Sequence, residues 1–278
     1  MNNEQPQVLI VILNYGTYEM TIDLINQLHS ELEYKNYSIM VVDNYSPNNS
    51  AKILRERSSD LDYIFYPNNT NSGYAAGNNI GIRYAIEHNY MYTWILNNDV
   101  ELRDKSVLMH MISVMERDAS IGCIGPKIYT KEETVCAPYH KRPSFFDMTF
   151  GVFFHKRNRK KYSNTSRVVY RVYGCCMLLR NSMMNQIGCL DERTFLYGEE
   201  QILAERLLSI GATSYYDSEV SIKHNESGTM KKMSKASKDL RIRESERSRE
   251  IYLKDYRRFN RIERKMCHFV WRLIYRLR

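Results

Sequence analysis

The chain has 278 residues, 43% of them hydrophobic, and a formal net charge of +8 at pH 7. These values allow one large core, or a core plus an extension, and they exclude an intrinsically disordered protein. No apolar run approaches the roughly 20 residues that cross a bilayer, and the polar N-terminus lacks the pattern of a signal peptide. The six cysteines include no CxxC pair, so we expect reduced thiols, no zinc site and a cytoplasmic location.

In the first hundred residues, apolar strands alternate with amphipathic helical patterns. Strands are predicted at 8–13, 37–42, 64–66 and from 92 onward. A helical pattern with apolar positions from Met20 to Leu28 follows the first strand, and another at about 78–88 precedes the fourth. This order predicts an α/β fold with a mostly parallel central sheet flanked by helices. The absence of an early GxGxxG motif disfavours a dehydrogenase-type dinucleotide fold.

The second half of the chain is less regular. Helices are predicted at 105–118 and 199–210, and strands at 122–129, 168–179 and 215–222. Residues 131–166 mix prolines, aromatic residues and basic residues, and we interpret them as a long loop near a binding site.

Polar residues gather where the predicted strands end. They are Asn14 and Tyr15, Asp43 and Asn44, the segment from Asn71 through Gly73 and Gly77 to Asn78, and Asn97, Asn98 and Asp99. In open α/β sheets, ligands bind at the carboxyl ends of the strands. A carboxylate among amides suits a Mg²⁺ or Mn²⁺ ion that holds a diphosphate, although each cluster alone is equally consistent with a strand-end turn. Asp43 can accept hydrogen bonds from a base or ribose, and the small residues at 73–77 let the backbone approach a ligand.

Several sequence blocks occur in a fixed order: Val-Ile-Leu-Asn-Tyr at 11–15, Val-Val-Asp-Asn-Tyr-Ser at 41–46, the glycine-containing block 71–81, Asn-Asn-Asp-Val at 97–100, and two later blocks at 174–180 and 191–200. This order resembles family 2 glycosyltransferases, in particular their bacterial rhamnosyltransferase-like branch. The resemblance covers about residues 7–228. It implies a GT-A fold and an inverting sugar transfer from a nucleotide-activated donor.

The resemblance also implies roles for individual residues. Asn97-Asn98-Asp99 occupies the DXD position, so Asp99 is the expected metal carboxylate, and Asn97 replaces the aspartate that many members have. His224 matches a late histidine of the family and is the expected second metal ligand; a structural hydrogen bond at a strand end is the alternative. Contacts with the nucleotide-sugar are expected from the polar clusters, namely Asn14, Tyr15, Asp43, Asn71, Gly73, Gly77, Asn78, Asn97 and Asn98.

The expected catalytic base lies in the pair Glu199-Glu200. Glu200 aligns with the family's base and is favoured over Glu199, and it is one methylene longer than the aspartate usual at that position. An inverting transfer needs one carboxylate to take the proton of the acceptor hydroxyl. The alternative is that both are acids at a helix N-terminus, where they interact with the helix dipole. The basic segment 228–235 is either a loop over the diphosphate, through Lys231 and Lys232, or a solvated charge run.

The basic residues concentrate near the C-terminus. Apolar residues there recur at steps of three and four, at Tyr252, Tyr256, Phe259, Ile262, Met266, Phe269, Leu273 and Leu277. This pattern predicts one long basic amphipathic helix. We therefore expect a glycosyltransferase domain at 1–235 and a helical extension at 236–278. The extension either packs on the domain, joins a second subunit in a homodimer, or lies on an anionic membrane.

The sequence thus predicts a metal-dependent glycosyltransferase that uses a UDP- or dTDP-sugar and Mn²⁺ or Mg²⁺. The expected acceptor is a lipid-linked saccharide in cell-surface polysaccharide synthesis, met at the cytoplasmic face of the membrane. Rhamnose is the first candidate sugar, before galactose or a hexosamine. The alternatives are a nucleotidyltransferase and a nucleic-acid-binding protein that uses the basic tail. The first lacks the early basic phosphate loop, and the second leaves the motif blocks unexplained, so we expect no nucleic-acid partner.

Overall fold

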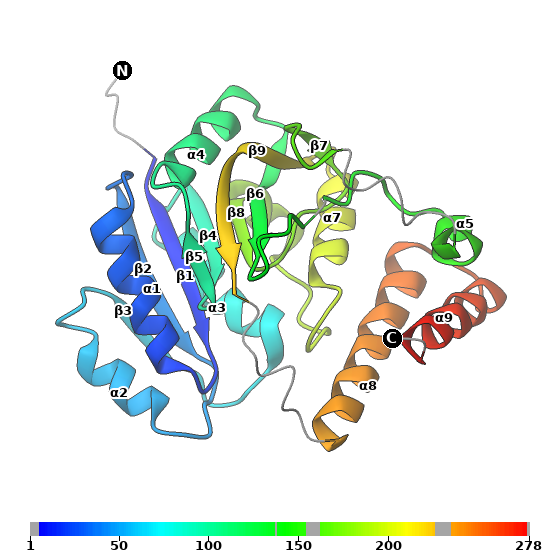
Figure 1. Ribbon diagram of the computed structural model, residues 1–278, viewed down its shortest axis with the longest axis horizontal. Coiled ribbons are helices and arrows are strands. Elements are labelled where there is room, and N and C mark those ends of the chain that lie inside the picture. The colour runs from blue at the N-terminus through cyan, green and yellow to red at the C-terminus, as the bar shows by residue number, and fades with distance from the viewer. Residues whose placement is uncertain (1–5, 137, 154–161, 226–234, 277–278) are drawn as a thin grey trace.

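The computed structural model describes residues 6–136, 138–153, 162–225 and 235–276. The strands form one nine-stranded sheet in the order β3-β2-β1-β4-β8-β6-β9-β5, with β7 paired to β9. Helices cover both faces of the sheet, and a pair of C-terminal helices stands at one side (Figure 1). The predicted α/β fold is confirmed.

The first half of the chain builds the parallel part of the sheet. Its strands are β1 (Val8–Asn14), β2 (Tyr37–Asp43), β3 (Ile64–Pro67) and β4 (Tyr92–Asn97). The connecting helices are α1 (Tyr18–Glu31), α2 (Ser50–Arg57) and α3 (Gly73–Glu87). The parallel register places Asn14 beside Asp43 and Leu13 beside Asn97. The ends of these strands therefore meet at one edge, as the sequence predicts.

Helix α3 begins at Gly73, five residues earlier than the predicted start at 78. The early glycines disfavour a helix by local propensity. They are nevertheless helical because they let α3 approach β1 closely: a Cβ at Gly77 would lie 2.6 Å from Leu13 Cδ1, and one at Gly81 would lie 2.4 Å from Val11 Cγ2. Packing on the sheet therefore overrides the local preference.

The second half of the chain mixes strand directions. It contains β5 (Val100–Leu102), α4 (Val107–Arg117), β6 (Ile121–Thr130), β7 (Arg167–Val169), β8 (Cys176–Arg180), α6 (Asn181–Ile187), α7 (Glu199–Ser209) and β9 (Thr213–His224). Strand β8 lies between β4 and β6 and is antiparallel to both, whereas β6 and β9 are parallel.

The prediction of one strand at 168–179 is wrong. Strand β7 pairs with β9, whereas β8 pairs with β4 and β6, so the chain crosses from one part of the sheet to another between them. The connecting residues 170–175 lie at the same edge as the end of β4, because the backbone N–H of Asn97 donates to the carbonyl of Cys175 at 2.9 Å.

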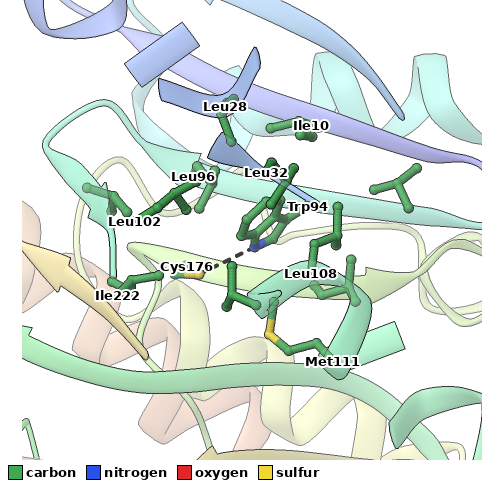
Figure 2. Close-up of a cluster of buried hydrophobic side chains, with 14 of the residues drawn as sticks. Ile10, Leu28, Leu32, Trp94, Leu96, Leu102, Leu108, Met111, Cys176 and Ile222 are labelled. Carbon is green, nitrogen blue, oxygen red and sulfur yellow. Dashed lines mark hydrogen bonds between the residues drawn. The ribbon is translucent and has the colours of Figure 1, made fainter. Parts of the chain in front are cut away.

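The largest buried cluster lies between the sheet and the helices α1 and α4 (Figure 2). Trp94 of β4 is fully buried in it, beside Leu28 of α1 and Met111 of α4. The indole N–H of Trp94 donates to Cys176 Sγ at 3.3 Å, which satisfies the only polar group of that ring. Burial raises the pKa of the Cys176 thiol to about 12, so it stays protonated.

The C-terminal segment folds back on itself. Helix α8 (Lys235–Ile251) continues into a π-helical turn (Tyr252–Tyr256), and α9 (Arg261–Arg276) returns alongside α8 (Figure 1). The prediction of one long helix is therefore wrong. Arg258 adopts a left-handed backbone with φ 52°, and Asn260 starts a new helix, since its Oδ1 accepts from the Glu263 N–H at 3.0 Å while Glu263 Oε2 accepts from the Asn260 N–H at 2.8 Å. This reciprocal pair is a capping box.

The helix pair α8–α9 packs on the rest of the chain through its own small core. Cys267 of α9 and Leu253 lie fully buried with Ile202 of α7 and Met148 of the short helix α5 (Phe145–Met148). A 3₁₀ turn, Phe150–Phe153, follows α5. Of the three arrangements expected for this segment, the structure shows the first, in which it packs on the preceding part of the same chain. The boundary predicted at 235 adjoins residues 226–234, which lie outside the described residues, so the two-domain division stays a prediction.

In the part of the chain that the structure describes, we find no helix with the length and apolar character that crossing a bilayer requires.

Candidate functional site

The ends of β1 and β2 form a closed polar network. Asn14 Nδ2 donates to Asp43 Oδ1 at 2.7 Å, and Ser46 donates to the same carboxylate through its backbone N–H at 3.0 Å and its hydroxyl at 2.6 Å. Asp43 is only 1% exposed, whereas Tyr15 beside Asn14 is 52% exposed. The network fixes the strand ends, and the rings of Tyr15 and Tyr45 beside it are exposed, at 52% and 61%.

A second network holds the start of α3. Asn44 Nδ2 donates to Asn71 Oδ1 at 3.0 Å, and Asn71 Oδ1 also accepts from the backbone N–H of Gly73 at 3.1 Å. Asn78 is fully buried and donates to the Tyr74 carbonyl at 2.9 Å. Its Oδ1 has no hydrogen-bond partner among the described residues, so it retains the capacity to accept one.

Gly73 and Gly77 serve close packing. Gly73 has φ +89°, and a Cβ there would lie 2.2 Å from the carbonyl oxygen of Phe195. The next residue strengthens this contact, because the backbone N–H of Tyr74 donates to the same carbonyl at 2.9 Å. Gly77 therefore lets α3 approach β1 on one side, and Gly73 lets it approach the loop before α7 on the other.

Asn98 ties the end of β4 to the start of α1. Its Nδ2 donates to Thr17 Oγ1 at 2.8 Å and to Thr21 Oγ1 at 3.0 Å. Thr21 Oγ1 in turn donates to Asn14 Oδ1 at 3.0 Å, so this network joins that of β1 and β2. The sequence signal for these partners is the spacing of two threonines one helical turn apart, and it was missed. The Asn98 amide is thus engaged by the fold, whereas Asn97 precedes it at the end of β4.

Asp99 and His224 meet because β5 pairs with β9. Val100 lies opposite His224 in this antiparallel pair, and the backbone N–H of Asn225 donates to the Asp99 carbonyl at 2.9 Å. The side chains approach at 3.1 Å between Asp99 Oδ1 and His224 Nε2. The sequence prediction that these residues act together is therefore consistent with their geometry.

This pair fits two adjacent ligand positions of a divalent cation. Metal–ligand bonds of about 2.1 Å at right angles place neighbouring ligand atoms about 3 Å apart, which matches the distance between Asp99 and His224. Across 6–136, 138–153, 162–225 and 235–276 we find no group of three or more His, Cys, Asp or Glu side chains placed to hold a metal. A cation held by this pair needs further oxygen ligands from water and from the phosphates of a substrate, as is common for Mg²⁺.

Two adjacent carboxyl groups begin α7, after Gly198 in a left-handed conformation. Glu200 Oε1 accepts from the Gly174 N–H at 3.1 Å, and its Oε2 lies 3.9 Å from Arg171 Nη1. The Glu199 side chain is buried, with 5% exposure for the residue, and its Oε1 has no hydrogen-bond partner in the described structure. Burial, and then the charge of Glu200, raise the pKa of Glu199 to about 8. Glu199 is therefore neutral at neutral pH, while Glu200 faces a cation.

The start of α3 lies between the sheet edge that carries Asp99 and His224 and the carboxyl groups at the start of α7. Tyr74 OH donates to the Gly174 carbonyl at 2.6 Å, and Gly174 holds Glu200 through its N–H. Arg171 was missed by the sequence analysis, as no motif marks it. The structure places its guanidinium 3.5 Å from the centre of the Tyr139 ring and beside Glu200.

Residues 8–188 match the family model described as glycosyl transferase family 2. The chain belongs to this family. Its membership favours the glycosyltransferase prediction over the nucleotidyltransferase alternative.

Curated relatives of this family 2 chain include two sugar transferases. It is 27% identical over 192 residues to the low-salt glycan biosynthesis hexosyltransferase Agl10 of Haloferax volcanii, covering 69% of this chain and 58% of that protein. It is 24% identical over 206 residues to N-acetylglucosaminyl-diphospho-decaprenol L-rhamnosyltransferase of Mycobacterium tuberculosis, covering 68% and 66%. The chain thus spans less than two thirds of the length of either relative.

A solved structure shares the fold of this family 2 chain. The mannosyltransferase PcManGT from Pyrobaculum calidifontis, in complex with GDP-Man and Mn²⁺, superposes with a TM-score of 0.64 at 14% sequence identity, covering 96% of this chain and 69% of that one. The likeness confirms the predicted GT-A fold.

Lys231 and Lys232, expected in a basic loop of this family 2 site, lie outside the described residues.

Proposed function

We propose that this family 2 chain is a metal-dependent inverting glycosyltransferase with Glu200 as its base. The observation that carries the proposal is the difference in surroundings between the two carboxyl groups at the start of α7. Of its two carboxyl groups, Glu199 is buried and holds a proton, whereas Glu200 is partly exposed and interacts with Arg171 and the Gly174 N–H. Glu200 is therefore the carboxyl group of this pair that is accessible to an acceptor, near the sheet edge that carries Asp99 and His224.

The mechanism follows from these groups. Glu200 accepts the proton of the acceptor hydroxyl as that oxygen attacks the anomeric carbon of the donor sugar from the face opposite the leaving diphosphate. The bond from the sugar to the diphosphate breaks, and the configuration inverts. Arg171 and the Gly174 N–H hold the carboxylate in one orientation before the reaction. The neutral Glu199 avoids a second negative charge beside the base.

We propose Asp99 and His224 as the ligands of Mn²⁺ or Mg²⁺. When bound, such an ion stabilises the negative charge of the departing diphosphate. The support is their separation of 3.1 Å, which fits adjacent ligand positions, and the Mn²⁺ in the complex of the mannosyltransferase PcManGT. Asn97 adds a neutral amide near this pair, so the charge that attracts the ion comes from Asp99.

The donor edge is proposed to bind the nucleotide. Tyr15, exposed beside the network of Asn14 and Asp43, is placed to stack on a base, and Asn78 Oδ1 has hydrogen-bonding capacity left among the described residues. The remaining expected contacts, Asn71, Gly73, Gly77 and Asn98, act in this proposal by shaping the edge, because their side chains or α-carbons are engaged in packing and hydrogen bonds.

The donor is proposed to be a UDP- or dTDP-sugar, with rhamnose as the first candidate. The acceptor is proposed to be a lipid-linked saccharide in cell-surface polysaccharide synthesis. Both proposals draw support from the rhamnosyltransferase relative, whose name gives a sugar diphospho-decaprenol as its acceptor, and from the hexosyltransferase relative of glycan biosynthesis. Transfer of a sugar to such an acceptor would take place with the chain at the cytoplasmic face of a membrane.

The substitution Glu200→Gln tests the assignment of the base. We expect turnover to fall by about a hundredfold or more, because a positioned general base contributes about 10²–10⁴-fold. The rise in melting temperature caused by the nucleotide-sugar and Mn²⁺ should remain, because Glu200 is not one of the proposed metal ligands Asp99 and His224. The matched control is Glu219→Gln, an exposed carboxyl on β9. Near-normal turnover of E200Q would refute the role of Glu200.

A further inference from the structure

Helix α9 exposes an apolar stripe. Ile262 is 71% exposed and Phe269 69%, and Met266 and Leu273 complete the stripe with exposures of 36% and 40%. At 3.6 residues per turn, these four positions fall within about 60° of the helix circumference. A contiguous exposed face of this kind on a helix of 16 residues is typical of an interaction site.

The stripe is not the face that holds α9 in place. Cys267, on the opposite side of the helix, is fully buried in the small core under the helix pair. The flank of α9 that meets α8 forms two ion pairs, Arg264 with Glu250 at 2.8 Å and Arg272 with Glu246 at 2.6 Å, and His268 Nε2 lies 2.9 Å from the Glu250 carboxyl group. The position of α9 is therefore set without the four exposed apolar side chains.

Basic residues lie along one flank of the stripe. By helix geometry, Lys265 and Arg261 follow directly on the circumference next to Phe269. Both are exposed, and neither forms an ion pair within the described ranges of the chain. An apolar face bordered by uncompensated basic residues is the pattern of helices that lie in the plane of an anionic membrane.

The neighbouring segment adds exposed aromatic rings. Helix α5 packs against α9, with the Phe145 ring edge-on to Phe259 at 5.9 Å between centroids. Phe146 and Phe150 of the same segment are 55% and 51% exposed. Phenylalanine is one of the side chains that interfacial segments bury at the boundary between headgroups and acyl chains.

We propose that the stripe Ile262–Met266–Phe269–Leu273, with Arg261 and Lys265 on its flank, docks on an anionic lipid surface with the axis of α9 in the membrane plane. A second copy of the chain is a poorer occupant. In a two-fold contact with the two copies of α9 antiparallel, the basic flanks of both copies would lie on the same side of the interface, and like charges at an interface oppose association. The amphipathic character of α9 also distinguishes surface docking from a membrane span.

The helix pair α8–α9 connects the proposed docking face to the loop that precedes the proposed base Glu200. Ser248 of α8 donates to the Leu196 carbonyl at 3.4 Å, and Arg241 stacks over the Tyr197 ring at 5.2 Å. The helix that α9 packs against is thus in contact with the loop just before Glu199 and Glu200. Access to an acceptor in the membrane through this docking rests on the proposed lipid-linked acceptor, whereas the docking itself depends only on the surface of α9.

Co-sedimentation of the full chain with vesicles tests the proposal. We expect binding to vesicles of equal parts phosphatidylglycerol and phosphatidylcholine, weak binding to phosphatidylcholine alone, and release by high salt. The double substitution Ile262→Ser/Phe269→Ser should weaken binding at least about tenfold, because burial of each side chain in lipid is lost. Arg261→Gln and Lys265→Gln should each weaken it about fivefold.

A matched control separates the stripe from general surface hydrophobicity. Met109→Ser removes a side chain of α4 that is 43% exposed, and it should bind vesicles as the wild-type chain does. Equal binding by the wild-type chain and I262S/F269S would overturn the proposal. A dimer in light scattering that I262S/F269S converts to a monomer, without vesicle binding, would assign the face to a second copy. Absence of sugar transfer by the wild-type chain, with its vesicle binding intact, would count against the proposed function alone.

Discussion

The substitution Glu199→Gln should make the chain more stable at alkaline pH. Glutamine keeps the shape of the neutral Glu199 side chain, which is buried and has a pKa of about 8 against an ordinary value of 4.5. Above pH 4.5 the unfolded chain loses this proton, whereas the native chain keeps it until about pH 8. The native state therefore binds more protons in that window, and the free energy of unfolding falls as pH rises, by up to about 5 kcal/mol at pH 9.

Urea unfolding at several pH values measures this effect. The wild-type chain and E199Q should have similar unfolding free energies at pH 4.5, and E199Q should gain steadily up to about pH 8 and then keep its advantage. Because other ionisable groups are common to both chains, the difference isolates Glu199. Glu219→Gln, on an exposed part of β9, should show no such divergence. Parallel curves for E199Q and the wild-type chain would mean that Glu199 ionises normally, and the assignment of Glu199 as the neutral carboxyl group would fail.

Two further predictions concern the metal pair and the start of α3. Asp99→Ala should abolish the increase in nucleotide affinity that Mn²⁺ or Mg²⁺ causes, measured by thermal shift with and without the ion; unchanged metal dependence would place the ion elsewhere. Gly73→Ala should lower the free energy of unfolding by about 3 kcal/mol, because a Cβ there meets a backbone oxygen at 2.2 Å as well as a left-handed backbone. Gly211→Ala, with φ +76° and open space around it, should cost only about 1 kcal/mol, and equal losses would contradict the packing argument.

The part of the candidate site at the ends of β1, β2 and β4 is predictable from the sequence because its geometry follows from general rules. Apolar runs with intervening helices predict parallel strands, and parallel strands end at one edge. These rules predict that the strand ends near Asn14, Asp43 and Asn97 meet at one edge, and the register of β1 with β2 and β4 agrees. It could not assign hydrogen bonds to side chains such as Asn98, because its partners on α1 are set by how that helix packs.

The part of the candidate site around Arg171 and Glu200, and the C-terminal segment, are harder to predict for physical reasons. Residues 168–179 are apolar enough for one strand, and only the pairing partners of β7 and β8 reveal the crossing between them. Arg171 lies in that crossing, and no local pattern marks its approach to Glu200. In the C-terminal segment the apolar spacing continues through Asn260, whose capping box with Glu263 is a local signal that the periodicity concealed.

The antiparallel insertion of β8 gives the two halves of the site separate structural origins. Parallel strands contribute their carboxyl ends to the ligand edge, whereas β8 contributes the segment before its first residue, held there by the bond between Asn97 and Cys175. The edge is therefore assembled from two stretches of chain that can diverge independently, one before Asp99 and one after Arg171. A chimeric chain that exchanges only residues 171–200 between relatives would keep both Asp99 and His224, which makes this junction a natural place to recombine specificities.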